Sequence, residues 1–450
     1  MRVGLDRTQE RPLTNAERAC WLIDQLSPMK FVVVGHVEGA VDEAALRAAL
    51  DVVQARHPLL RVGIVPGPPP SYRATNQPIP LRVVLRERDD TWQGEVDRER
   101  GAPMDVAQGP LVRVVLVRSP ERSEILATFH HVMSDGVTGI RLFRDLLDAM
   151  DRRAQGTLGA LTPLPARPGV EQLLSREVRG WRGLRRSIRY LWGQLRTLLQ
   201  RPRKLPEERA IPLDQRRSRS RYLTLEPAVS TLLFERCKEE GITVHGALAA
   251  AALLSVSEHL RRAPGSSPTA LLGLCTPVNL RKELEPALGE EIGMFVGPIV
   301  SFHEVGASTG FWELARGVND AVRDARADHG PATALATQSR LLPRSASPRT
   351  ATELLYHPLF GAIALTNIGS PELPPRFGAL ALTRLHIAPT ADPFGSLLSL
   401  SVLTVHGRMS INFNYNEGLL SEPTIDAVVT ATLARLQEAA APRMLGLAPP

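Results

Sequence analysis

Two adjacent histidines, followed by an aspartate and a glycine, have the residue types and the spacing that best suit acid–base chemistry. They are His130, His131, Asp135 and Gly136, in the run HHVMSDG. A neutral imidazole can take a proton from a hydroxyl or an amine near pH 7, and glycine allows the positive φ that a tight turn can need. The run therefore indicates a histidine base in a short loop. The alternative is a structural role for both histidines, which for an isolated His-His pair is the commoner case.

Other kinds of site find little support in the sequence. Within the loop only Asp135 could join the histidines as a metal ligand, so we expect no metal centre, and we expect no cofactor. There is no G-x-S-x-G nucleophile elbow and no glycine-rich phosphate loop. Cys20, Cys237 and Cys275 lie far apart without a CxxC pair, which predicts reduced thiols in place of a zinc knuckle or disulfides.

The elements on either side of the loop must position these histidines. The apolar runs at 111–117 and 124–130 are separated by the turn-like SPERS, which predicts a β-hairpin. Neighbouring residues of a strand face opposite sides, so only one of the two histidines can face a given cleft. Residues 140–150 have helical spacing. The histidine strand therefore leads through a short loop into a helix.

The remaining segments alternate between strand and helix patterns in two halves. In the first half we expect a strand at 30–39, a helix at 42–56 and a strand at 59–65. In the second half we expect strands at 222–225, 271–277, 361–367, 398–405 and 408–415, helices at 227–238, 244–261, 309–326 and 425–439, and a polar, mobile loop at 345–350. This alternation predicts an α/β chain of two lobes. A proline- and glycine-rich linker at 158–170 suggests three parts: residues 1–170, 171–220 and 221–450.

The middle part carries an unusual charge. The whole chain has a net charge of +7, whereas residues 167–221 hold 16 basic and 5 acidic residues, which leaves −4 for the rest. An apolar stripe with helical spacing runs through Leu174, Val178, Trp181, Leu184, Ile188, Leu191, Leu195 and Leu198. Three interpretations stay open: a helix packed on the body with its arginines in water, contact of residues 174–199 with an anionic membrane surface, or docking of an acidic carrier protein or coenzyme A phosphates. Nucleic-acid binding is not expected, because no stacking aromatics or recognised fingerprint accompany the charge.

Length and composition restrict the class of protein. The 450 residues are 43% apolar and 22% charged, as in globular proteins. The first residues contain no apolar signal-peptide core, and the longest apolar stretch, 246–256, is too short to span a bilayer. We therefore expect a cytoplasmic protein, with peripheral membrane contact as an option, and neither an integral membrane protein nor a secreted one.

HHVMSDG matches the HHxxxDG motif, and the chain resembles the coenzyme-A-dependent acyltransferase superfamily. That group includes condensation domains of nonribosomal peptide synthetases, phthiocerol dimycocerosyl transferases and bacterial wax ester synthases. Other segments resemble the superfamily in the expected order: PLTNAERACWLIDQL, VDEAALRAALDVVQARHPLLR, GPLVRVVLV, GITVHGALAAAALL, PVNLR, IGMFVG and ALTNIGS. Together they cover most of the chain, from about residue 12 to 439. The basic segment has no firm counterpart.

The resemblance implies two chloramphenicol-acetyltransferase-like lobes in a V-shaped pseudo-dimer with a central channel. It makes His131 the catalytic base, His130 its non-catalytic neighbour, and Asp135 the structural partner of Arg281. Gly136 would give room near the channel. Asn367 is a weak candidate for the oxyanion, with a satisfied strand-end amide as the equal alternative. The plant relatives' DFGWG motif is replaced here by Asp392-Pro393-Phe394-Gly395, so we do not transfer its role.

The function implied is acyl transfer from a thioester, on coenzyme A or a carrier protein, to a hydroxyl or amine acceptor in natural-product or lipid biosynthesis. No acyl-enzyme is needed, because the histidine acts as a general base. We favour ester formation. One alternative is a stand-alone, amide-forming condensation enzyme, and a second is a non-catalytic module that binds carrier proteins.

Overall fold

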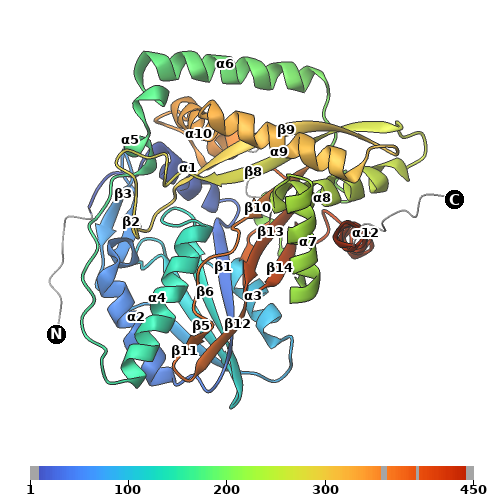
Figure 1. The fold of residues 1–450 in the computed structure, drawn as a ribbon. Helices are drawn as coiled ribbons and strands as arrows, with labels where there is room; N and C mark the ends of the chain where they lie inside the picture. Colours follow the sequence, from blue (N-terminus) through green and yellow to red (C-terminus); the bar gives the residue numbers. More distant parts are fainter. Residues whose placement is uncertain (1–9, 356–361, 392–394, 442–450) are drawn as a thin grey trace.

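The computed structural model describes residues 10–355, 362–391 and 395–441. Figure 1 shows two lobes, each built from a β-sheet with helices packed against it. Helix α6 (Gly180–Leu199) lies at the top edge of the view, where the chain passes from one lobe to the other. The two-lobed α/β architecture predicted from the sequence is confirmed.

The first lobe is built on a mixed β-sheet, and one strand of this sheet ends at the first histidine of the HHVMSDG run. Within the described residues its order is β11 (Arg376–Phe377), β12 (Leu380–Pro389), β1 (Lys30–Glu38), β6 (Arg122–His130), β5 (Val112–Arg118) and β4 (Leu81–Leu85). The predicted hairpin of β5 and β6 is present and antiparallel. Lys30 lies opposite His130 in the pairing of β1 with β6. The histidine strand is therefore an inner strand, held on both sides.

Helices cover both faces of this sheet. On one face lie α2 (Glu43–Arg56) and α4 (Gly136–Ala154), and on the other α3 (Thr91–Gly101). α2 begins where the Asp42 side chain accepts a hydrogen bond from the Ala45 N–H, a common N-terminal cap. α4 packs so closely that a Cβ at Gly35 of β1 would lie 1.9 Å from Phe143 Cζ.

Short elements complete the first lobe. They are α1 (Asn15–Asp24) and a two-stranded sheet of β2 (Val62–Val65) and β3 (Ser71–Ala74). The strand predicted at 59–65 is shorter than expected, because Pro58–Arg61 forms a 3₁₀ turn. Proline at the start of that turn has its φ already fixed near the helical value.

The second lobe has its own mixed sheet. Within the described residues its order is β7 (Ser218–Leu225), β14 (Arg408–Asn416), β13 (Leu398–Val405), β10 (Ile363–Asn367), β8 (Thr269–Asn279) and β9 (Val296–Gly306). β9 was not predicted; it pairs antiparallel with β8 at the edge of the sheet. β10 runs parallel to both β8 and β13, and its Ile363 and Leu365 are buried.

The helices of the second lobe include all four that were predicted. They are α7 (Pro227–Glu239), α8 (Val244–Arg261), α9 (Phe311–Ala327), α10 (Gly330–Leu341), α11 (Pro348–Leu355) and α12 (Glu422–Ala440). The loop predicted at 345–350 is wrong in its second half, because α11 starts at Pro348, where the Ser347 hydroxyl accepts from the Thr350 N–H. Among the described residues no single helix is long and apolar enough to cross a membrane, although α7 and α8, bent by 102°, meet that test as a pair.

One pair of strands crosses between the lobes. β11 and β12 come late in the chain, within the range 221–450 that the sequence assigned to the second lobe. β12 nevertheless pairs with β1 along its length, from Pro389 opposite Phe31 to Ala381 opposite Glu38. The sequence did not indicate this pairing, because backbone pairing between distant segments leaves no local pattern in the sequence.

The basic segment folds into α5 (Val170–Leu173), a 3₁₀ turn at Arg176–Val178 and α6. Leu174 and Val178 of the predicted stripe are buried. Along α6, however, the buried residues are Gly183 and Ser187, which face α10. An amphipathic helix usually packs with its apolar face against the body, but in α6 the buried positions are Gly183 and Ser187 and most of the apolar stripe is exposed.

Candidate active site

His131 is the first residue after β6 and lies in the turn before α4. Its backbone N–H donates to the Met29 carbonyl at 2.8 Å. Its Nδ1 lies 3.2 Å from the Ser134 carbonyl oxygen, which can only accept, so Nδ1 carries the proton. Nε2 is then the basic nitrogen, and the described part of the chain offers it no hydrogen-bond partner. Burial lowers the pKa of His131 to about 4, so the ring is neutral at neutral pH.

His130 points the other way and is fully buried in the first lobe. Its Nδ1 accepts from the Val132 N–H at 3.1 Å, and its Nε2 lies 3.2 Å from Asp24 Oδ2. Burial alone would raise the pKa of Asp24, but the contact with His130 holds it below the ordinary value. The opposite facing predicted for the two histidines is present, and His130 is occupied by these structural contacts.

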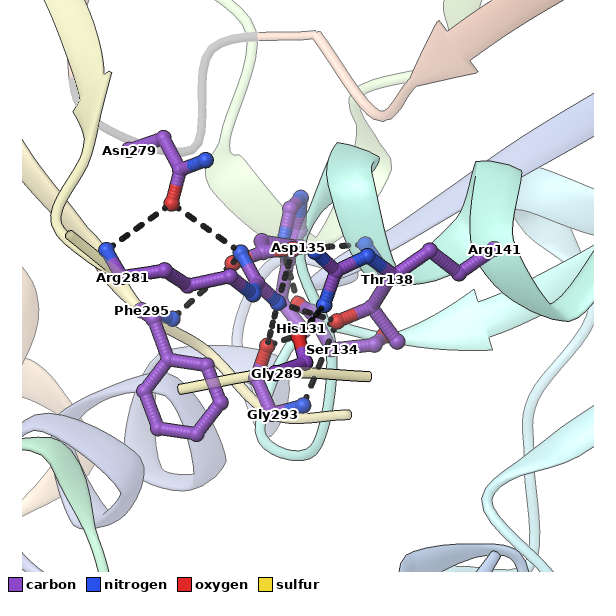
Figure 2. A network of polar contacts seen from close by, with 10 residues as sticks. All are labelled: His131, Ser134, Asp135, Thr138, Arg141, Asn279, Arg281, Gly289, Gly293 and Phe295. Carbon is purple, nitrogen blue, oxygen red and sulfur yellow. Dashed lines mark hydrogen bonds and ion pairs between the residues drawn. The ribbon is translucent and has the colours of Figure 1, made fainter. Parts of the chain in front are cut away.

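Asp135 and Arg281 form a buried ion pair, each about 2% exposed (Figure 2). The guanidinium reaches both carboxylate oxygens, with Nη1 to Oδ2 at 2.8 Å and Nη2 to Oδ1 at 3.0 Å. Two backbone N–H groups add to this, from Thr138 at the start of α4 and from Phe295. Burial would raise the pKa of Asp135, but the charge of Arg281 and these hydrogen bonds hold it below the ordinary value. The pair joins the histidine loop of one lobe to the end of β8 in the other.

The sequence did not indicate the groups that surround this pair. Arg281 Nη2 also donates to Thr138 Oγ1 at 2.8 Å, and Thr138 Oγ1 donates to the Gly293 carbonyl. Asn279 Oδ1 accepts from the backbone and the side chain of Arg281. Figure 2 shows these residues converging from both lobes. Asn279 belongs to the PVNLR segment, which the resemblance already included. Nothing in the sequence predicted the contact of Thr138 with Arg281, apart from the position of Thr138 near the start of a predicted helix.

His131 lines a cavity of about 230 Å³ between the lobes. The lining comes from the histidine loop, α1, α10, α11 and strands of the second sheet, and most of it is apolar. Its ionisable side chains, among the described residues, are His131, the paired Asp135, Cys20 and Cys275. Burial raises the pKa of both thiols to about 12, so they stay protonated and are poor nucleophiles. His131 is therefore the one lining group suited to proton transfer near neutral pH.

Gly136 and Asn367 differ in their relation to this cavity. Gly136 lines the cavity. A Cβ at this position would lie 2.5 Å from Ile368 Cδ1, so the glycine allows the loop after β10 to pack against the start of α4. Asn367 is absent from the described lining, and its Oδ1 accepts from the Gly369 N–H at 2.9 Å. This geometry favours the satisfied strand-end amide. The first three residues of the segment 392–395 lie outside the described residues.

Comparison with known proteins identifies the class. The family model for the condensation domain matches residues 7–442, so the chain belongs to the condensation-domain family. Condensation domains are acyl- or peptidyl-transferring enzyme domains, as the resemblance implied. A similar protein is the probable non-canonical nonribosomal peptide synthetase CymA of Salinispora arenicola, 29% identical over 330 residues. Those residues are 70% of this chain but only 4% of that protein.

Solved structures support the fold. The trichothecene 15-O-acetyltransferase TRI3 of Fusarium sporotrichioides matches with a TM-score of 0.73 at 14% identity, covering 96% of this chain and 95% of that one. Polyketide synthase associated protein 5 of Mycobacterium tuberculosis matches with a TM-score of 0.69 at 17% identity, covering 95% and 99%. These identities establish the fold alone, the pseudo-dimer of two chloramphenicol-acetyltransferase-like lobes.

Proposed function

We propose that this chain transfers an acyl group from a thioester to a hydroxyl or amine acceptor, with His131 as the general base. The observation that carries the proposal is the free Nε2 of His131 at a largely apolar cavity between the lobes. We assign Asp135 and Arg281 as positioning residues, because they bond to each other and Asp135 also accepts from the Thr138 and Phe295 N–H groups. His130 and Gly136 support the same loop, and Asn367 has no part in the chemistry.

The tautomer of His131, with its proton on Nδ1, determines that Nε2 accepts the proton in the proposed reaction. Nε2 takes the proton of the acceptor as its oxygen or nitrogen forms a bond with the thioester carbonyl carbon. The C–S bond of the tetrahedral intermediate then breaks, and the imidazolium of His131 donates the proton to the departing sulfur. Because burial disfavours a charged His131, we expect the second proton transfer to follow closely. The products are a thiol and an ester or amide, and no acyl-enzyme is formed.

A hydroxyl acceptor fits the lining better than an amine. An amine is mostly an ammonium ion near pH 7 and binds best beside a free carboxylate. In the described lining the one carboxylate, Asp135, is already engaged by Arg281 and two backbone N–H groups. The apolar lining also suits an uncharged acyl chain. We therefore favour ester formation in natural-product or lipid assembly, with amide formation as the alternative.

The donor is a thioester of coenzyme A or of an acyl carrier protein. Relatives such as CymA are synthetases many times longer than this chain, and a carrier protein acting with the domain is consistent with that similarity. A cytoplasmic location goes with such donors. Contact with an anionic membrane is a separate proposal, which depends on α6.

The test is thiol release and product mass spectrometry with a library of acyl thioesters and hydroxyl or amine acceptors. We expect His131→Gln to lower the turnover by roughly 10²–10⁴-fold, as loss of a general base does, with the melting temperature unchanged. His130→Gln is the matched control and should act mainly through stability, because His130 contacts Asp24 and the loop backbone. Full activity in His131→Gln would contradict the mechanism, whereas no turnover by the wild type with any donor and acceptor would favour the non-catalytic carrier-binding module.

A further inference from the structure

Helix α6 exposes an apolar stripe that nothing in the described structure covers. Its large apolar side chains are between 39% and 76% exposed: Trp181, Leu184, Ile188, Leu191, Trp192, Leu195 and Leu199. Few other large apolar side chains of the described chain are comparably exposed. A helix of 20 residues is about 30 Å long. The stripe is therefore a long apolar ridge, and exposed apolar patches of this size usually mark an interaction surface.

The packing of α6 keeps this ridge outside. On the α10 side, Ser187 Oγ accepts hydrogen bonds from Thr337 Oγ1 at 2.8 Å and from Arg340 Nη1 at 2.6 Å. Arg186 and Arg189 bind Asp328. Figure 1 shows α6 along the outer edge of the molecule with α10 beneath it. The small and polar contacts fix the helix to the body while the apolar side chains stay in solvent.

The charge beside the ridge is strongly positive. α6 contains five arginines and no acidic residue. Arg182 pairs with Glu177, whereas Arg185 and Arg196 have no acidic partner among the described residues. By helical periodicity these two follow the ridge on the side where Trp181 and Trp192 border it. An apolar face with tryptophans at its edge and arginines beside it is typical of helices that lie in a membrane interface.

The shape and charge of the ridge select among the possible partners. A second copy of the chain would bring two rows of arginines together without a carboxylate from either α6, which is unfavourable. A carrier protein would have to deliver its thioester to the cavity, but the ridge lies on a different side of α6 from α10, whose residues line that cavity. A long, straight ridge suits a continuous anionic surface.

We propose that α6 docks the protein on an anionic lipid membrane, with the apolar ridge in the headgroup region and the arginines at the lipid phosphates. An open hollow at the N-terminal end of α6 relates this docking to the active cavity. It is lined by Val178, Arg179 and Arg340, and it shares Asn15 and Ser339 with the His131 cavity. A membrane on the outer side of α6 would thus meet the helix whose N-terminal end borders a hollow that adjoins the active cavity.

Sedimentation of the full chain with vesicles tests the proposal. We expect binding to phosphatidylcholine vesicles that contain phosphatidylglycerol, weaker binding to pure phosphatidylcholine, and loss of binding at high salt. The triple variant Leu184→Ser, Ile188→Ser, Leu195→Ser and the double variant Arg185→Gln, Arg196→Gln should each bind roughly tenfold more weakly or worse. Leu85→Ser is the matched control, because Leu85 is 69% exposed and lies on β4, the edge strand of the sheet in the first lobe. Its binding should equal that of the wild type.

Tryptophan fluorescence gives a second measurement. Anionic vesicles should shift the emission to the blue, and less so in Trp181→Phe, Trp192→Phe. No binding at low salt, or equal binding by the triple variant, would overturn the proposal. So would a wild-type dimer that the triple variant converts to monomer, or protection of the two tryptophans by an acidic carrier protein and not by vesicles. Turnover of a soluble thioester without vesicles should be unchanged in the α6 variants, so this test is independent of the acyl-transfer proposal.

Discussion

At the scale of single residues, the proposed chemistry depends on which nitrogen of His131 is free. The Ser134 carbonyl fixes the proton on Nδ1 and leaves Nε2 as the base. Phe31 packs against the ring, with centroids 4.8 Å apart, and helps to exclude water. The same burial that orients the ring lowers its pKa to about 4. The proposed base is therefore unprotonated, and able to accept a proton, across the physiological pH range.

The pH dependence of kcat/KM follows from this shift. A general base works only when unprotonated, so activity should be lost as the pH falls through the pKa in the folded enzyme. We expect the acid limb below the ordinary histidine value of 6.5, toward about 4. Return of each sample to neutral pH for a second assay controls for unfolding. An acid limb at 6.5 would show that His131 is solvated in the working enzyme.

The Asp135–Arg281 pair should contribute mainly to stability. Removing one partner strands a buried charge, which costs about 3–5 kcal/mol of the unfolding free energy. We therefore expect Asp135→Asn and Arg281→Met to be strongly destabilising singly, and the double variant to be less destabilised than their sum. Urea unfolding of the three variants measures the coupling. Strict additivity would show that the two side chains act independently.

Much of the residue-level site could be predicted from the sequence. The opposite facing of His130 and His131 follows from strand geometry, and the pairing of Asp135 with Arg281 followed from the resemblance. The N–H of Phe295, which donates to Asp135 Oδ2, could not be predicted. A backbone donor has no residue type of its own, and only the fold brings it there.

At the scale of elements, the start of α4 depends on the loop after β10. Gly136 is its first residue, and a Cβ there would meet Ile368 Cδ1 at 2.5 Å. We expect Gly136→Ala to lower activity, because the methyl group pushes the histidine loop or Ile368 aside. The second change Ile368→Ala removes the obstructing atoms and should restore much of it. Thermal melts with turnover assays measure both, and Ile368→Ala alone is the control. No rescue would mean that the glycine matters for a reason other than this contact.

Elements with a strong local pattern were predicted well, and those defined by distant pairing were not. α2, α4, α8 and α12 show helical periodicity, and the β5–β6 hairpin has two apolar runs around a turn. β12 was missed, and its pairing with β1 spans more than 300 residues of sequence. In α6 the periodicity was predicted correctly, but the sequence left three interpretations of the stripe open. Only the structure shows that the apolar face is exposed and that the face with Gly183 and Ser187 is packed.

At the scale of the whole molecule, the lobes are joined through buried polar groups as well as apolar ones. His386 of β12 contacts both Trp92 and Tyr222, and its Nδ1 is 2.8 Å from Asn412 Oδ1 of β14. Burial lowers the pKa of His386 to about 3. Other histidines have pKa values lowered in the same way by burial: His36 to about 3, and His131, His245 and His303 to about 4.

These histidines make the stability of the fold depend on pH in a defined window. Each has a lower pKa folded than its ordinary 6.5, so the unfolded chain binds more protons between pH 6.5 and about 4. The unfolding free energy should therefore be highest above pH 6.5 and fall, by an amount on the order of several kcal/mol, as the pH drops toward 4. Asp135, with a lowered pKa, loses its contribution only below its ordinary 3.8, outside this window. Urea unfolding at stepwise pH measures the slope, which should be shallower in His386→Gln because one titrating group is gone. A flat profile between pH 7 and pH 5 would mean that the histidines are solvated and that the junction between the lobes is looser than the structure has it.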